Sequence, residues 1–178
     1  MNKKELRFAD INDSKDDLIV EGYAAVFEKE TVLFSCGDTD YKEIIDRNAF
    51  LGADLSDVVF KYNHSNDFLV LARTSNNTLQ LSVDEMGLKM TANLADVQAG
   101  RDLYNLIKRR DINKMSFAFT VREESYDTKT HTRRILKFDK IYDVSAVDIP
   151  AYNDTTITAR DYFKTQNDLR QKLILLTY

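Results

Sequence analysis

The chain has 178 residues, of which 43% are hydrophobic and 11% aromatic, and its formal net charge is −4. This composition is typical of one globular domain, and the negative charge argues against a nucleic-acid binder, which normally carries a basic surface for phosphates. The single cysteine excludes an internal disulfide, and together with only two histidines it cannot build the usual structural zinc site. We therefore predict no bound metal and no cofactor.

The N-terminal lysines are not followed by an apolar run, and no stretch of about 18 apolar residues could cross a bilayer. We expect neither a signal peptide nor a membrane partner. The single cysteine is compatible with a reducing compartment. A soluble, cytoplasmic protein is the resulting expectation.

The first part of the chain has the pattern of β-structure. Residues 18–27 form a β-rich run, residues 40–50 predict a strand that leads into a turn or short helix, and residues 57–64 are rich in β-branched and aromatic residues. The last of these runs ends in the polar cluster "NHSND". His64 is thus expected where a strand gives way to a loop.

A hairpin and a helix are predicted next. Apolar residues alternate on both sides of the turn "DEMG" within residues 77–94, which indicates two antiparallel strands. Residues 96–111 have helical spacing, with Asp96 as the expected N-cap and Gly100 as a weakening residue.

Residues 113–120, "NKMSFAFT", predict a strand with a serine in its middle. Because side chains alternate along a strand, Met115, Phe117 and Phe119 are expected to face the core. Ser116 then lies on the opposite face beside Ala118, either as a small packing residue or as a nucleophile.

The remainder of the chain predicts a polar hairpin tip, a return strand and a helix. The tip is expected at residues 124–133 and the strand at residues 134–150, where Pro150 ends it. Residues 161–178 are amphipathic with helical spacing, which fits a helix packed on the domain or a partner-binding tail.

Three polar residues could form a nucleophilic relay. Ser116 would attack a carbonyl, His64 would take its proton, and Asp143 would orient the imidazole. Each has an ordinary alternative: a packing serine, a histidine in an exposed loop, and an aspartate paired with a lysine such as Lys140. His131 is a rival third member, but its surroundings predict an exposed hairpin tip.

Asp143 is expected to share a strand face with Ile141, Ser145 and Val147. A carboxylate among largely apolar neighbours needs a partner, and a histidine would serve. No glycine-rich signature marks an oxyanion hole, and the places to look for it are the loop before Asp143 and residues 133–140, which include Arg133 and Arg134.

The order and spacing of these blocks resemble the prohead (head maturation) proteases of tailed phages. The resemblance covers about residues 5–160 and rests on the blocks "EGYAAVFEKE", "EIIDRNAF", "VVFKYNHSNDFLVLART", "LSVDEMGLKMTANLADVQAGRDLYNLIKRRDINKMSFAFTV" and "IYDVSAVDIPAYNDTTI". It implies a serine endopeptidase with a fold similar to that of the herpesvirus maturational protease. Such a fold is mainly β with α, as a small closed or partly open β-barrel flanked by helices. The protease domain would comprise residues 1–158, followed by a C-terminal helix or interaction tail at residues 159–178.

The resemblance also implies site residues. The family's histidine after a strand matches His64, its serine matches Ser116, and its acidic residue matches Asp143, where glutamate is common. The shorter aspartate needs a compensating backbone placement to reach the histidine. Ala118 stands where a glycine is expected.

The implied substrates are the major capsid protein and the scaffolding protein, cleaved together with the protease itself inside the assembling procapsid in the host cytoplasm. No nucleic acid and no membrane are expected as partners, and a homo-oligomer stays open. The alternative is a non-catalytic capsid assembly or scaffolding module on the same fold, which Ala118 and Asp143 leave open.

Overall fold

The computed structural model of the protein describes residues 9–10, 18–66 and 69–148, whose strands form two sheets. The first sheet has the order β1-β2-β8-β7 and contains β1 (Ala9–Asp10), β2 (Ile19–Val26), β7 (Leu79–Val83) and β8 (Gly87–Asn93). The second sheet contains β3 (Thr31–Cys36), β4 (Thr39–Ile45), β5 (Val59–Tyr62), β6 (Ala72–Arg73), β9 (Lys114–Asp127) and β10 (Thr132–Val147). The short η1 (Thr74–Asn76) and the helix α1 (Gln98–Lys108) complete the elements.

The prediction of a mainly β fold with α is confirmed. Within the described ranges no strand pairing closes either sheet into a barrel, and α1 is the one α-helix. The barrel and the flanking helices are therefore not shown. The boundary at residue 158, Pro150 and the helix predicted at residues 161–178 lie outside the described residues.

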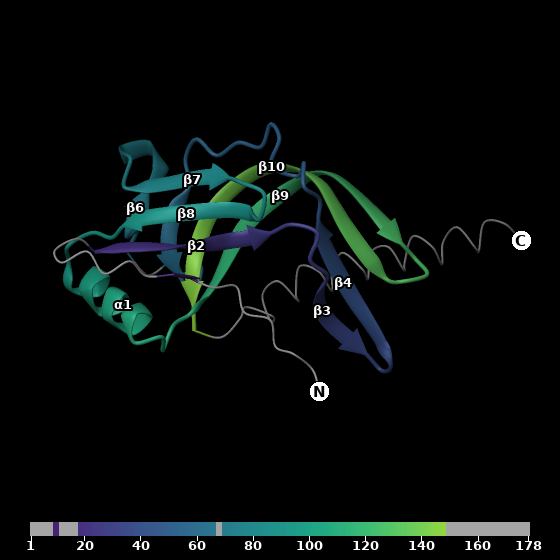
Figure 1. The fold of residues 1–178 in the computed structure, drawn as a ribbon, viewed down its shortest axis with the longest axis horizontal. Helices are drawn as coiled ribbons and strands as arrows, with labels where there is room; N and C mark the ends of the chain where they lie inside the picture. Colours follow the sequence, from purple (N-terminus) through teal and green to yellow (C-terminus); the bar gives the residue numbers. More distant parts are fainter. Residues whose placement is uncertain (1–8, 11–17, 67–68, 149–178) are drawn as a thin grey trace, which may run out of the picture.

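The long strand β10 organises the second sheet. On one side it pairs with β9 in antiparallel fashion along most of its length. On the other side its first residues pair in parallel with β4, and its last residues, Asp143 to Ala146, pair in parallel with β5. In Figure 1 the β9–β10 ribbon arches from the first sheet and α1 to the far end of the molecule, where β3 and β4 lie. β10 therefore links two regions of the protein.

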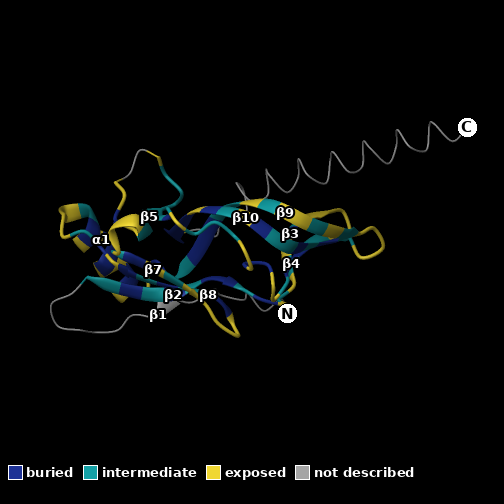
Figure 2. Ribbon diagram, turned by 90° about the horizontal axis from the view of Figure 1, so that it is seen from above, coloured by how far each residue is buried: buried dark blue, intermediate teal, exposed yellow. Residues whose placement is uncertain are grey.

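The core lies mainly between the two sheets. Figure 2 shows buried residues gathered along the strands and exposed residues at the turns. Fully buried apolar side chains come from both sheets and include Val20, Phe60, Leu79, Leu88, Met90, Ile135, Phe138, Ile141 and Val144. Phe138 contacts the rings of Phe50, Phe117 and Phe119 at centroid distances of 4.6, 5.6 and 4.8 Å. This aromatic cluster holds the apolar face of β9 against the core, as the alternation around Ser116 predicted.

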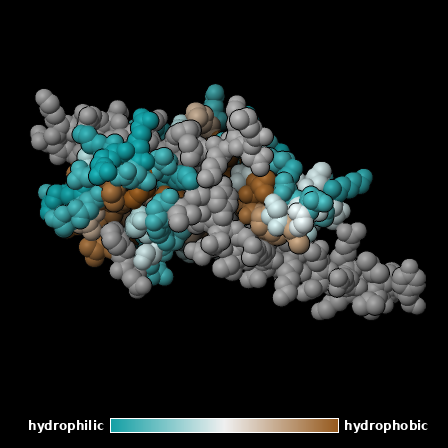
Figure 3. Space-filling model, turned by 90° about the horizontal axis from the view of Figure 1, so that it is seen from below, coloured by the Kyte–Doolittle hydropathy of each residue, from teal (hydrophilic) through white to brown (hydrophobic). Residues whose placement is uncertain are grey.

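The surface is mostly hydrophilic. In the view of Figure 3, hydrophilic side chains cover much of the described surface and apolar ones form separate patches. Large exposed apolar side chains come from several places along the chain, among them Val32, Leu51, Leu69, Val83, Met86 and Tyr142. None of the helices in the described part of the chain has the length and apolar character needed to cross a membrane.

Helix α1 confirms the prediction at residues 96–111 but begins differently. Its N-cap is Val97, which has no side-chain capping hydrogen bond, and the Asp96 carboxylate binds the Arg101 guanidinium instead. A Cβ at Gly100 would lie 2.0 Å from the carbonyl oxygen of Ala95. Gly100 therefore permits a close approach of the preceding loop, in addition to its cost in helix propensity.

The predicted hairpin tip at residues 124–133 is mostly strand. β9 continues to Asp127 and β10 begins at Thr132, so that only residues 128–131 form the turn. The polar side chains have cross-strand partners, because the Arg133 guanidinium donates to the Glu124 carboxylate at 2.5 Å and to that of Glu43 at 3.2 Å. A polar sequence can continue a strand when its charges are paired in this way.

Candidate functional site

The candidate site lies on three adjacent strands, β5, β10 and β9. Ser116 on β9 is directly opposite Ser145 on β10, and Ala118 is directly opposite Asp143. Directly opposed residues of an antiparallel pair project to the same face of the sheet. Ser116, Asp143 and Ser145 therefore share one face, which is the face opposite to the aromatic cluster.

A backbone irregularity turns Asp143 to this face. Between Ile141 and Asp143 the register of β10 against β9 shifts, so that Ile141 is opposite Phe119 whereas Asp143 is opposite Ala118. Phe119 and Ala118 are successive residues and point to opposite faces. The prediction that Asp143 shares a face with Ile141 is therefore wrong, because the extra residue of a bulge inverts the alternation. The prediction that Asp143 shares a face with Ser145 is confirmed by the register of β10 against β9.

His64 reaches Asp143 through a left-handed turn. β5 is parallel to the end of β10, so its C-terminal end lies beside Ala146. Asn63 and His64 then have φ values of 51° and 53°. This region is rarely used except by glycine and by residues such as Asn and His, and it ends the extended course of β5. The histidine side chain comes to lie over β10 rather than continuing beyond it.

Several hydrogen bonds hold this turn. The Asn63 backbone N–H donates to the Ala146 carbonyl at 2.9 Å, and its side-chain amide donates to the Asp148 carboxylate at 2.9 Å. The Tyr62 hydroxyl donates to the other oxygen of the same carboxylate, also at 2.9 Å. These contacts fix the backbone immediately before His64, so the imidazole is placed by a rigid support.

The side chains of His64 and Asp143 are in direct contact. The distance from His64 Nδ1 to Asp143 Oδ1 is 2.6 Å, and the two side chains are 20% and 9% exposed. Because an ionised carboxylate can only accept, the proton of the neutral imidazole is on Nδ1. That tautomer leaves the lone pair of Nε2 available as a base.

Ser145 is part of the site, although sequence reasoning assigned it no role. Its side chain is fully buried, and its hydroxyl donates to Asp143 Oδ1 at 2.8 Å. The Ser145 hydroxyl oxygen also accepts the backbone N–H of His64 at 3.3 Å and lies 3.4 Å from His64 Nδ1. The sequence did contain a signal for this role, because Ser145 is two residues after Asp143 and was therefore expected on the same face of the strand.

Ser116 lies next to this cluster and is 7% exposed. Direct cross-strand neighbours have Cβ atoms about 5 Å apart, which places Ser116 beside the Ser145 hydroxyl that contacts His64. Among the described residues the Ser116 hydroxyl makes no hydrogen bond to His64. Catalytic hydrogen bonds are often long in unliganded proteins and tighten around the substrate.

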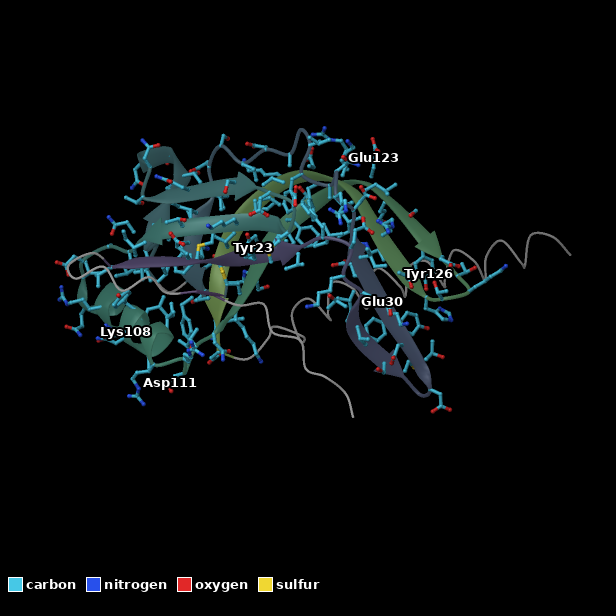
Figure 4. The ribbon with its side chains drawn as sticks, in the orientation of Figure 1. Tyr23, Glu30, Lys108, Asp111, Glu123 and Tyr126 are labelled. Carbon is cyan, nitrogen blue, oxygen red and sulfur yellow. The ribbon has the colours of Figure 1, made fainter. Side chains whose placement is uncertain are left out.

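His131 is far from this cluster. Its Nδ1 lies 3.1 Å from the hydroxyl of Tyr126, and its ring lies 5.0 Å from that of Tyr41. Figure 4 labels Tyr126 near the tip of the β9–β10 hairpin, whereas Lys108 and Asp111 are labelled near α1 at the opposite end of the molecule. Ser116 follows Asp111 closely in sequence, so His131 is at the wrong end of the ribbon to join it.

Other residues considered for the site have different partners. Lys140 donates to Asp54 at 2.8 Å rather than pairing with Asp143. Arg134 binds Glu28 and Asp46, and Arg133 binds Glu43 and Glu124, all near the β4 end of β10. The guanidinium groups of Arg133 and Arg134 therefore lie away from Ser116 and Ser145, which are near the other end of that long strand, and the oxyanion hole stays unassigned.

The structure shows no metal centre in the part of the chain that it describes. No group of three or more His, Cys, Asp or Glu side chains is close enough there to hold an ion. The chemistry available at the face formed by Ser116, His64 and Asp143 is proton transfer coupled to nucleophilic attack.

The sequence matches a family model described as the caudovirus prohead serine protease over residues 4–168. The chain belongs to this family. No curated protein and no solved structure matches it. The matched span of the prohead protease family includes all three strands of the candidate site, and it supports a serine-type protease of phage capsid maturation. The resemblance inferred from the sequence blocks is confirmed at the level of the family.

Proposed function

We propose that the protein is a serine endopeptidase of phage capsid maturation, with Ser116 as nucleophile, His64 as general base and Asp143 as the residue that orients the imidazole. The observation that carries the proposal is the 2.6 Å contact between His64 and Asp143 beside the cross-strand pair of Ser116 and Ser145. A serine hydroxyl is a weak nucleophile at neutral pH and needs such a base.

In this mechanism the Ser116 oxygen attacks the carbonyl carbon of the scissile peptide bond while its proton moves to His64 Nε2. The Asp143 carboxylate holds the Nδ1–H and stabilises the imidazolium that forms. The imidazolium then gives its proton to the leaving amine, and a water molecule hydrolyses the acyl-enzyme by the reverse sequence of proton transfers. Both steps use the same histidine atom.

The strand arrangement suggests how a peptide substrate is held. In the described pairings β9 is hydrogen-bonded to β10 only, so its other edge takes part in none of these strand pairings. An extended peptide can add to such an edge through main-chain hydrogen bonds. Ser116 lies on this edge strand, so an added peptide would run past the nucleophile.

The proposed substrates are the scaffolding protein or the scaffolding segment of the major capsid protein, and the protease itself. Cleavage would take place inside the assembling procapsid in the host cell. Residues 159–178 are proposed as an interaction tail or a segment removed by self-cleavage. The relation of the fold to the herpesvirus maturational protease is part of the same proposal and rests on the resemblance.

Co-expression with the major capsid protein of the same phage tests the proposal. The parent chain should produce new capsid-protein termini that mass spectrometry can map, and Ser116→Ala should produce none. Ser82→Ala, at an exposed position of β7, is the matched control and should process normally. Unchanged processing by Ser116→Ala would reject the protease function in favour of a non-catalytic assembly module.

A further inference from the structure

We propose that Ser145 is a positioning residue of the site, which holds the side chains of His64 and Asp143 together. This inference rests on the proposed function. Ser145 does not contact the substrate in this scheme, because its side chain is fully buried behind the histidine and the acid. Its role is to orient two other side chains.

Ser145 fixes the orientation of the Asp143 carboxylate. The Ser145 hydroxyl donates to the same oxygen of Asp143 that contacts His64 Nδ1, at 2.8 and 2.6 Å respectively. Two donors on one oxygen fix the rotation of the carboxyl group about its Cβ–Cγ bond. A carboxylate without the second donor could rotate and present either oxygen at a less favourable angle.

Ser145 also holds the backbone of His64. The Ser145 oxygen accepts the His64 N–H at 3.3 Å, which ties the left-handed turn directly to β10. One hydroxyl therefore acts on both partners, because it draws the His64 backbone toward β10 and aims the Asp143 oxygen at the ring.

The strand register places Ser145 between β5 and β9. Ser145 is opposite Ser116 on one side and opposite Lys61 of β5 on the other, so it occupies the middle of a three-strand row that includes the proposed nucleophile. The Ser145 oxygen lies 3.4 Å from His64 Nδ1, and a serine hydroxyl offers both a donor and an acceptor at this point.

Kinetics separate positioning from packing. The substrate is a peptide that spans a cleavage site mapped in the co-expression experiment, and the variants are Ser145→Ala, Ser145→Cys and Ser145→Thr. We expect Ser145→Ala to lower kcat by about 10- to 100-fold with little change in KM, since small misplacements of catalytic groups have effects of this size. Ser145→Cys should behave like the alanine variant, because a thiol is a weak hydrogen-bond donor. Ser145→Thr should recover much of the rate.

A spectroscopic measurement provides a readout that does not depend on turnover. The chain has only two histidines, so ¹⁵N-histidine labelling in a Ser116→Ala background gives the Nδ1 and Nε2 signals of two rings, and His131→Gln identifies those of His64. We expect a slowly exchanging Nδ1–H signal for His64. In Ser145→Ala this proton should exchange faster with water, and in Ser145→Thr it should again be protected.

The outcomes of the two measurements are distinct. If Ser145→Ala matches the parent in both kcat and Nδ1–H exchange, or if Ser145→Cys restores both, the positioning role is wrong. If co-expression with the capsid protein produces no new termini but the exchange of the His64 proton depends on the Ser145 hydroxyl, the proposed function fails while the positioning role is supported. Thermal unfolding of each variant shows whether the fold is retained.

Discussion

His64 and Asp143 are 79 positions apart in the sequence, yet their side chains meet at 2.6 Å because β5 and the end of β10 run in parallel. A sharp left-handed turn at one residue and a register shift just before the other bring the two groups to the same face of the sheet. The contact therefore depends on two local departures from regular strand geometry.

Asp143→Asn should leave the fold intact and remove most of the activity. The amide has the size of the carboxylate but no charge, and it can stabilise the imidazole in the wrong tautomer. In a known serine protease triad this change lowers kcat by about 10⁴-fold, and we expect a loss of about 10²- to 10⁴-fold here. Initial rates on a cleavable peptide measure the effect. Activity within tenfold of the parent would argue against a role for Asp143 in orienting His64.

Asn63→Ala should destabilise the turn that carries His64. Asparagine tolerates the left-handed region at φ 51°, whereas alanine is strained there and cannot replace the amide contact with Asp148. We expect a loss of about 1–2 kcal/mol in the free energy of unfolding and a larger proportional loss of activity. Asn63→Gly is the matched control, since it removes the amide but adopts the same φ without strain. Urea denaturation should rank alanine below glycine, and the opposite order would contradict the role of the left-handed backbone.

Gly100→Ala should destabilise the protein even though alanine is the better helix former by about 1 kcal/mol. The new Cβ would meet the carbonyl oxygen of Ala95 at 2.0 Å, so the loop before α1 would have to move. We expect a net loss of about 1–3 kcal/mol, as for other overpacked positions. Asn105→Ala, on the exposed side of the same helix, should be neutral or slightly stabilising. Equal stability of the two variants would show that the loop accommodates the methyl group.

Glu28→Gln should make the free energy of unfolding less dependent on pH in the acid range. The Arg134 guanidinium donates to both carboxylate oxygens of Glu28, at 2.8 and 2.7 Å, and these hydrogen bonds hold the pKa of Glu28 below its ordinary value of 4.5. The unfolded chain then binds this proton more readily than the folded one. The stabilisation is complete above the ordinary value and is lost as the pH falls through the lower folded value.

Unfolding measured from neutral pH into this acid range checks the prediction. The free energy of unfolding of Glu28→Gln should be lower than that of the parent at neutral pH and should approach it as the solution is acidified. Arg134→Gln should have a similar effect, since it removes the donor. A constant difference between Glu28→Gln and the parent across this range would contradict the linkage.

Local patterns predicted much of the fold because they report on backbone periodicity. The hairpin of β7 and β8, the helix α1 and the strand around Ser116 all follow apolar spacing. The strand β3 was not predicted. A signal for it was present, since Gly37 with φ 59° lies in the short turn between β3 and β4.

The site was predictable in its residue types but not in its construction. A strand followed by polar residues placed His64 at a loop, as observed. The register shift before Asp143 could not be read from the sequence, because a bulge depends on how β9 and β10 fit together. The role of Ser145 was hidden for the same reason, since its partners come from two other positions on neighbouring elements.

The late position of β10 in the sequence determines when the site can form during synthesis of the chain. β10 pairs with β9 along its length and in parallel with both β4 and β5, and it is the last strand along the described chain. A nascent chain that has emerged from the ribosome only through β9 holds His64 and Ser116 but lacks Asp143 and the strand that brings them together. The proposed peptidase would therefore be inert throughout most of its own translation, and it would gain activity only after the final strand is inserted.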